Sequence, residues 1–135
     1  MAGFIFWVGL WYYLGMKERE FKLDLNEKPF DAIKAGIKKV EGRTPKDESD
    51  KRYNEMKEGD SIVFTNNVSF EKMSCKVLYV RKYKDARTML EAEGIKNVLF
   101  SEGDIEQGIE SYHNIADYKE RISKFGIYAI GVEKI

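Results

Sequence analysis

The segment from Ile127 to Val132 is the part of this sequence that most restricts how the chain folds. Side chains alternate between the two faces of a strand, so Ile127 and Ala129 are expected to share one face. Tyr128, Ile130 and Val132 are then expected to share the other face. A strand that is apolar on both faces is typical of the centre of a sheet or of a barrel.

Strand and helix patterns follow one another irregularly along the rest of the chain. Helices that do not alternate regularly with strands argue against a doubly wound sheet. A chain of 135 residues suits a single domain. We therefore predict an α+β fold, a small mixed or antiparallel β-barrel with helices packed at its ends. Strand patterns cover residues 20–25, 38–43, 61–64, 68–83 and 127–132, helix patterns cover residues 28–35, 85–93, 104–113 and 117–124, and residues 44–58 and 95–100 are expected to be a mobile or irregular loop and a connector.

Charge and cysteine content argue against several classes of function. The chain has 23 Lys plus Arg and 23 Asp plus Glu, so no overall basic excess favours broad binding to nucleic acid. One cysteine, Cys75, and one histidine, His113, are too few for an internal disulfide or for a zinc site built from protein ligands alone. We expect Cys75 to be buried in a strand and His113 to lie exposed or half-buried on a helix. Neither a metal, nor a cofactor, nor a DNA-specific motif is predicted.

Residues 2–15 form an apolar segment without a charged side chain. The segment is short for a membrane span, and it lacks the basic leader and cleavage site of a secretory signal. It has three interpretations: an artefact of the assigned translation start, with Met16 as the true start; a helix or strand that packs on the domain or on a second copy; or a short membrane-surface anchor. We therefore divide the chain into this segment, residues 1–15, and a cytoplasmic domain, residues 16–135, whose oligomeric state stays open.

The stretch GIKKVEGR, residues 36–43, carries the most concentrated chemistry of the sequence. Gly36 is expected to end a helix, which places Lys38 at the junction between a loop and a strand. Glu41 and Arg43 are two positions apart on that strand, so they share one face. A carboxylate, a guanidinium and an ammonium group are therefore expected to lie close together.

Three interpretations fit this cluster. In a recognition site, Arg43 would bind a phosphate or a base edge, Lys38 would supply a charge, and Glu41 would accept from an exocyclic amino group. In a catalytic site, a desolvated Lys38 would act as base or nucleophile, and Glu41 would position water or relay a proton. In a structural role, Glu41 and Arg43 would form a salt bridge, and Lys38 would be solvated.

Further motifs follow this stretch in order along the chain. They are GDSIVF at residues 59–64, MLEAEG at residues 89–94 and GIYAI at residues 126–130. With GIKKVEGR, which fits the pattern G-x-K-x-x-E-x-R, they resemble the ASCH domain family of the PUA-like superfamily over Phe21 to Ile135. The resemblance implies a PUA-like β-barrel with a cleft beside GIKKVEGR that takes RNA or a nucleotide-like ligand.

The resemblance also implies an alternative function. Some bacterial members of the family are amidohydrolases that remove the acetyl group from N4-acetylcytidine, and their catalytic lysine matches Lys38. Three positions on, those enzymes have a catalytic threonine where this chain has Glu41. Their third catalytic residue is a later glutamate, for which Glu91, Glu93 and Glu102 all stay open.

Two more residues are candidates for ligand binding. The loop of residues 44–58 has balanced charges and is either a solvated flexible loop or a lid over the cleft. Its Tyr53 is a candidate stacking platform for a base. Asn66, in a predicted turn, completes the predicted ligand-binding set with Lys38, Glu41 and Arg43. We expect binding of RNA or a modified nucleoside, with hydrolysis of an acylated nucleoside as the alternative.

Overall fold

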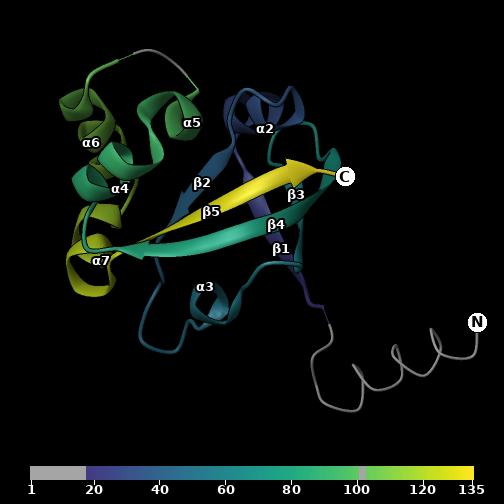
Figure 1. The fold of residues 1–135 in the computed structure, drawn as a ribbon, viewed down its shortest axis with the longest axis horizontal. Helices are drawn as coiled ribbons and strands as arrows, with labels where there is room; N and C mark the ends of the chain where they lie inside the picture. The colour runs from purple at the N-terminus through teal and green to yellow at the C-terminus, as the bar shows by residue number, and fades with distance from the viewer. Residues whose placement is uncertain (1–17, 101–102) are drawn as a thin grey trace, which may run out of the picture.

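A five-stranded mixed sheet forms the framework of the protein, seen in a computed structural model that describes residues 18–100 and 103–135 (Figure 1). The strand order is β1-β3-β4-β5-β2. β1 and β3 run parallel, while the other neighbouring pairs run antiparallel. The sheet curls into a half-barrel, as the predicted α+β, PUA-like architecture requires. The strands are β1 (Glu20–Leu25), β2 (Val40–Arg43), β3 (Ser61–Asn66), β4 (Lys72–Tyr83) and β5 (Ile127–Lys134).

Six helices in the described residues pack around this sheet. Figure 1 shows α4, α5, α6 and α7 gathered beside one end of the sheet, away from α2 and α3. None of these helices is long and apolar enough to cross a membrane. The predicted apolar segment, residues 1–15, lies outside the described residues. The helices are α2 (Glu27–Lys34), α3 (Arg52–Glu55), α4 (Ala86–Glu93), α5 (Ile95–Leu99), α6 (Ile105–His113) and α7 (Tyr118–Phe125).

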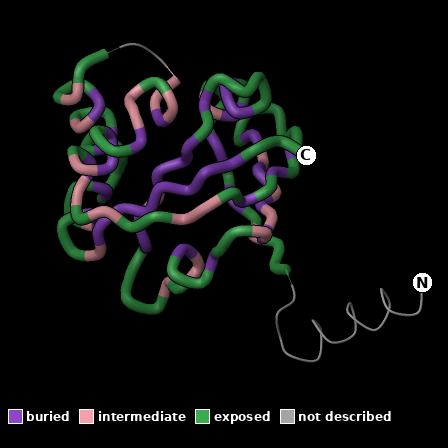
Figure 2. Tube along the Cα trace, viewed as in Figure 1, coloured by how far each residue is buried: buried purple, intermediate pink, exposed green. Residues whose placement is uncertain are grey.

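β5 is an interior strand between β4 and β2, and it is buried along most of its length (Figure 2). Its Ile127 and Ala129 pack into a core built with α4, α6 and α7. Its Tyr128, Ile130 and Val132 pack into a second core built with α2, α3, β1, β3 and β4. The prediction of a strand that is apolar on both faces is therefore confirmed.

A β-bulge in β4 changes one predicted face. Met73, Cys75 and Val77 point into the core that contains α2, as their alternation predicts. The register shifts between Val77 and Tyr79, so Tyr79 instead packs against the core that contains α4. The alternating pattern of residues 73–79 predicts that Tyr79 shares the face of Val77. This prediction is wrong, because the bulge inserts one residue and reverses the alternation.

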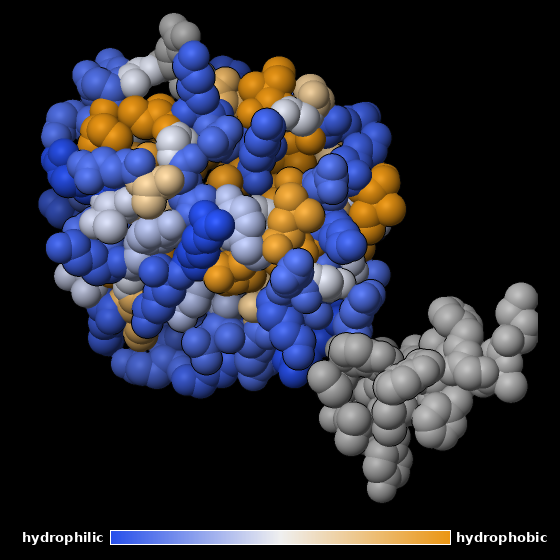
Figure 3. All heavy atoms as spheres, in the orientation of Figure 1, coloured by the Kyte–Doolittle hydropathy of each residue, from blue (hydrophilic) through white to orange (hydrophobic). Residues whose placement is uncertain are grey.

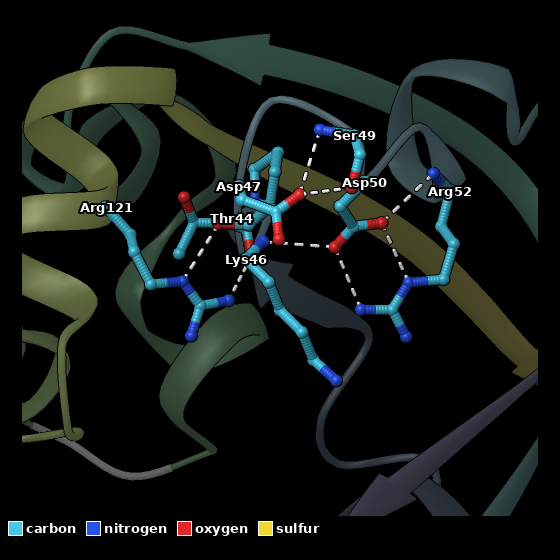
Figure 4. Close-up of polar contacts among 8 residues, drawn as sticks. Thr44, Lys46, Asp47, Ser49, Asp50, Arg52 and Arg121 are labelled. Carbon is cyan, nitrogen blue, oxygen red and sulfur yellow. Dashed lines mark hydrogen bonds and ion pairs between the residues drawn. The ribbon is translucent and has the colours of Figure 1, made fainter.

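The predicted loop of residues 44–58 is held by several polar contacts (Figure 4). Arg121 on α7 donates to the carbonyl oxygens of Thr44 and Pro45. The Asp50 carboxylate accepts from the backbone of Lys46 and from the guanidinium of Arg52, at 3.0 and 2.9 Å. The loop also contains α3, which the sequence did not indicate. The predicted connector 95–100 likewise contains a helix, α5.

Other predictions for single residues agree with the structure. Cys75 is buried in β4, and His113 is exposed at the end of α6. Asp85, the first residue of the predicted helix 85–93, caps α4 by accepting from the backbone N–H of Thr88. The face shown in Figure 3 is mostly hydrophilic with separate hydrophobic patches, as the high proportion of charged residues suggests.

The ring of Tyr79 lies over Gly131 of β5, where a Cβ atom would stand 2.3 Å from a ring carbon. We therefore expect Gly131→Ala to lower the free energy of unfolding by about 1–3 kcal/mol through overpacking. The same substitution in a Tyr79→Ala background is expected to cost much less, because the clashing ring is gone. Urea denaturation of the four proteins of this double-mutant cycle measures the difference. Equal costs in both backgrounds would contradict the proposed contact.

Candidate functional site

The GIKKVEGR stretch leads from the end of α2 into the edge strand β2. Gly36 follows α2 with a φ of 76°, a left-handed conformation that glycine adopts without strain. The backbone N–H of Lys39 donates to Asn97 O at 2.8 Å, and Lys39 O accepts from the N–H of Val132 at 3.0 Å. The stretch is therefore fixed on one side by α5 and on the other by β5.

Lys38 is buried, with an exposed fraction of 4%. Its ammonium donates to Val40 O at 2.7 Å and to Val98 O, and it lies 3.4 Å from Glu41 Oε1. These acceptors match the three N–H bonds of an ammonium group. Burial lowers the pKa of Lys38, although the Glu41 carboxylate opposes this. The interpretation of Lys38 as a solvated side chain is therefore wrong.

Glu41 and Arg43 form the salt bridge that their spacing predicts. Arg43 Nε donates to Glu41 Oε2 at 2.7 Å. Burial alone would raise the pKa of Glu41, but the charges of Arg43 and Lys38 outweigh it and hold the pKa below its ordinary value. The Glu41 carboxylate in turn raises the pKa of the half-buried Arg43 above its ordinary value. Glu41 and Arg43 are therefore both charged at neutral pH.

Arg43 also joins the two edges of the half-barrel. Its Nη2 donates to the carbonyl oxygen of Asp24 on β1 at 2.6 Å. β1 and β2 are the outer strands of the sheet, and no backbone ladder pairs them. The side chain of Arg43 therefore spans the gap where a closed barrel would have a strand pair.

A cavity of about 560 Å³ opens over this cluster. Lys38, Glu41, Gly42 and Arg43 contribute to its lining. One wall comes from the junction of β1 and α2, and the other comes from α5, α6 and the start of α7. Further lining residues from these walls include Asp24, Asn26, Glu27, Lys28, Pro29, Val98, Leu99, Phe100, Tyr112, Ile115 and Tyr118.

Two predicted ligand-binding residues lie elsewhere. Tyr53 is 2% exposed and packs in the core, with its ring centroid 6.0 Å from that of Tyr128. It therefore presents no open ring face on which a base could stack. Asn66 is buried, and its Oδ1 accepts from the backbone N–H groups of Val68 and Ser69 in the turn before β4. Asn66 is thus occupied in holding this turn, and neither residue lines the cavity.

Two of the three candidate glutamates, Glu91 and Glu93, lie in the described residues, and neither contacts the ammonium of Lys38. Glu91 is exposed on α4. Glu93 accepts from the hydroxyls of Tyr79 and Tyr83 and pairs with Arg81 at 3.2 Å. Glu102 lies outside the described residues. Neither of the two described glutamates lines the cavity.

The sequence indicated the base of the cavity but not its walls. Tyr112 and Tyr118 fall in predicted helices and Phe100 in a predicted connector, and nothing in the local pattern marks them as cavity residues. One available signal was Gly42, because a glycine inside a strand often marks a close approach of other atoms. The partner of that approach is Tyr112, which lies about 70 residues away in sequence and so could not be read from the local pattern.

Comparisons with known proteins agree on one family. The ASCH domain family model matches residues 23–135. The crystal structure of hypothetical protein PH0355 is 38% identical, with a TM-score of 0.73 over 86% of this chain and 99% of that chain. Protein PF0455 from Pyrococcus furiosus is 36% identical, with a TM-score of 0.66 over 86% and 97% of the two chains.

A more distant structure supports the fold alone. It is a mutant of the ZmASCH protein from Zymomonas mobilis, 14% identical, with a TM-score of 0.55 over 87% of this chain and 72% of that chain. No curated protein matches the chain.

Replacing Lys38 tests how far the cluster depends on its ammonium. We expect Lys38→Met to lower the free energy of unfolding by about 3–5 kcal/mol, because it removes a cation from the buried carboxylate and leaves Val40 O and Val98 O without a donor. The matched control is Lys39→Met at the neighbouring exposed position, expected to change stability by less than about 0.5 kcal/mol. Urea denaturation at neutral pH measures both values. Equal effects of the two substitutions would contradict the structural role of Lys38.

The lowered pKa of Glu41 predicts a pH dependence of stability. Its ordinary pKa is 4.5, and the folded value lies below this, so the unfolded chain binds a proton first as the pH falls. The stabilisation by the carboxylate is therefore complete above pH 4.5 and is lost as the pH falls through the folded pKa. We expect the stability difference between the wild type and Glu41→Gln to be largest at neutral pH and to shrink towards about pH 3. Urea denaturation across this range checks it, and a constant difference would contradict the assignment.

Proposed function

Because the chain belongs to the ASCH domain family, we propose that it binds RNA or a nucleotide-like ligand in the cavity over Lys38, Glu41 and Arg43. The observation that carries this proposal is the convergence of the three charged groups on one concave surface. A volume of about 560 Å³ lies within the range of small-ligand sites. A cavity of this kind suits a single nucleotide unit better than an extended strand.

The charge of the protein supports a compact ligand. Lys plus Arg equals Asp plus Glu, at 23 each, so a long basic track for many phosphates has no support in the composition. Arg43 is the cation of the cluster with the greatest exposure, since its side chain is 16% exposed against 4% for Lys38. Arg43 is therefore the side chain that we assign to direct ligand contact, and Glu41 is assigned to hold its guanidinium in place.

One observation favours a second candidate function. Burial lowers the pKa of Lys38, and a lysine with a lowered pKa beside a carboxylate can serve as a base in amide hydrolysis. The hydrogen bonds of Lys38 oppose this role, because its ammonium already donates to two backbone carbonyls and pairs with Glu41. We therefore place hydrolysis of an acylated nucleoside second to binding.

A binding assay with a matched arginine control tests the proposal. Isothermal titration with nucleosides, nucleoside monophosphates and short single-stranded RNA is expected to reveal at least one ligand. Arg43→Gln is expected to weaken its binding by roughly tenfold or more, since a hydrogen bond from a charged donor is lost. Arg81→Gln removes a more exposed arginine that pairs with Glu93 outside the cavity, and it is expected to leave binding unchanged.

Two outcomes would contradict the proposal: no binding across the panel, or equal losses in the two arginine variants.

N4-acetylcytidine in the same panel, followed by chromatography, tests hydrolysis. Turnover by the wild type that disappears in a folded Lys38→Met protein would move hydrolysis ahead of simple binding. Circular dichroism of each variant confirms that the fold is kept.

A further inference from the structure

The hydroxyl of Tyr112 reaches the cavity through a gap that Gly42 leaves in β2. A Cβ atom on Gly42 would stand 2.4 Å from Tyr112 Oη and 2.9 Å from the ring carbon that bears the hydroxyl. Both residues line the cavity. Any side chain at position 42 would therefore push the Tyr112 ring away from its present position.

This hydroxyl has no hydrogen-bond partner among the described residues, although Tyr112 is only 6% exposed. In the described part of the chain, every buried side-chain oxygen or nitrogen sealed from solvent has a partner. The Tyr112 hydroxyl is therefore not sealed from solvent, and we place its exposed side in the cavity that Tyr112 lines. The hydroxyl is thus free to bond to a ligand that enters the cavity.

Tyr112 is also held in its neutral form. Burial raises its pKa well above the ordinary value, and the nearby Glu41 carboxylate adds to this effect. A neutral phenol can both donate and accept a hydrogen bond. Next to it, Arg43 supplies donors only. The floor of the cavity, where Arg43 and Tyr112 lie, thus offers both hydrogen-bond donors and acceptors.

The walls of the cavity determine which ligand group fits above this floor. They carry apolar groups from both sides: Pro29, Val98, Leu99, Phe100 and Ile115. Walls of this kind suit the faces of a flat ring, whose polar edge would then point to Arg43 and Tyr112.

Charges around the cavity disfavour a phosphate inside it. The lining balances its carboxylates with an equal number of cations and so has no positive excess: Asp24, Glu27 and Glu41 against Lys28, Lys38 and Arg43. The ammonium of Lys38 is already engaged with Glu41 and two carbonyls. A phosphate in the cavity would face these carboxylates, whereas an uncharged ring would not.

We infer that the cavity binds an uncharged heteroaromatic nucleobase, which enters with its polar edge first. The Tyr112 hydroxyl and Arg43 form hydrogen bonds to this edge, and the phosphate stays outside the cavity. This inference rests on the proposed function and names the part of the ligand that the site recognises. It also makes Gly42 a determinant of specificity, because only glycine at this position leaves Tyr112 Oη where it is.

The test is titration of the wild type, Tyr112→Phe and Tyr128→Phe with four nucleosides and their 5′-monophosphates. Tyr112→Phe removes one oxygen and keeps the ring, and it is expected to weaken binding of the preferred nucleoside by about tenfold without lowering the melting temperature. Tyr128→Phe is the matched control, because Tyr128 is also 6% exposed but does not line the cavity. Its affinity is expected to equal that of the wild type.

The inference further predicts that a nucleoside and its monophosphate bind with similar affinity, and that salt affects both only weakly. Wild-type binding that Tyr112→Phe leaves unchanged would overturn the inference while the proposed function stands. Monophosphates that bind tenfold or more tightly than nucleosides, with a steep salt dependence, would overturn it in the same way. Absence of binding by the wild type would instead overturn the proposed function itself.

Discussion

Arg43 makes the contact on which the shape of the site depends. Its guanidinium bonds to Glu41 on its own strand β2 and to the carbonyl of Asp24 on β1, the opposite edge of the sheet. A half-barrel has two open edges, and here one side chain connects them. The cavity lies at this connection, and the ion pair of Glu41 and Arg43 forms part of its lining.

The cluster beneath the cavity is stabilised because each charge compensates another. Glu41 is buried, and a buried carboxylate is costly unless it is paired. Lys38 and Arg43 approach its two oxygens from different sides, and Lys38 also bonds to the carbonyl of Val98 on α5. The same ammonium thus ties α5 to β2. The wall and the base of the cavity therefore depend on one buried salt-bridge network.

The sequence could predict those parts of the fold that local patterns determine. The two apolar faces of β5 and the shared face of Glu41 and Arg43 follow from alternation over a few residues. The burial of Lys38 does not, because it requires a carbonyl of α5 that is distant in sequence and lies in a segment expected to be a connector. Tyr53 was misjudged for a similar reason: the charges around it suggested a solvated loop, whereas its ring packs against Tyr128 from the other end of the chain.

Recognition in such a site depends on the groups that the fold leaves uncommitted. Lys38 and Glu41 are bonded to each other and to the protein, so their contribution to a ligand is indirect. Arg43 retains partial exposure, and Tyr112 keeps a neutral hydroxyl without a partner among the described residues. The charges of GIKKVEGR are easily read from the sequence, yet two of the three, Lys38 and Glu41, are bonded within the protein. The chemistry that would distinguish one base from another lies in the tyrosine that a glycine in β2 admits to the site.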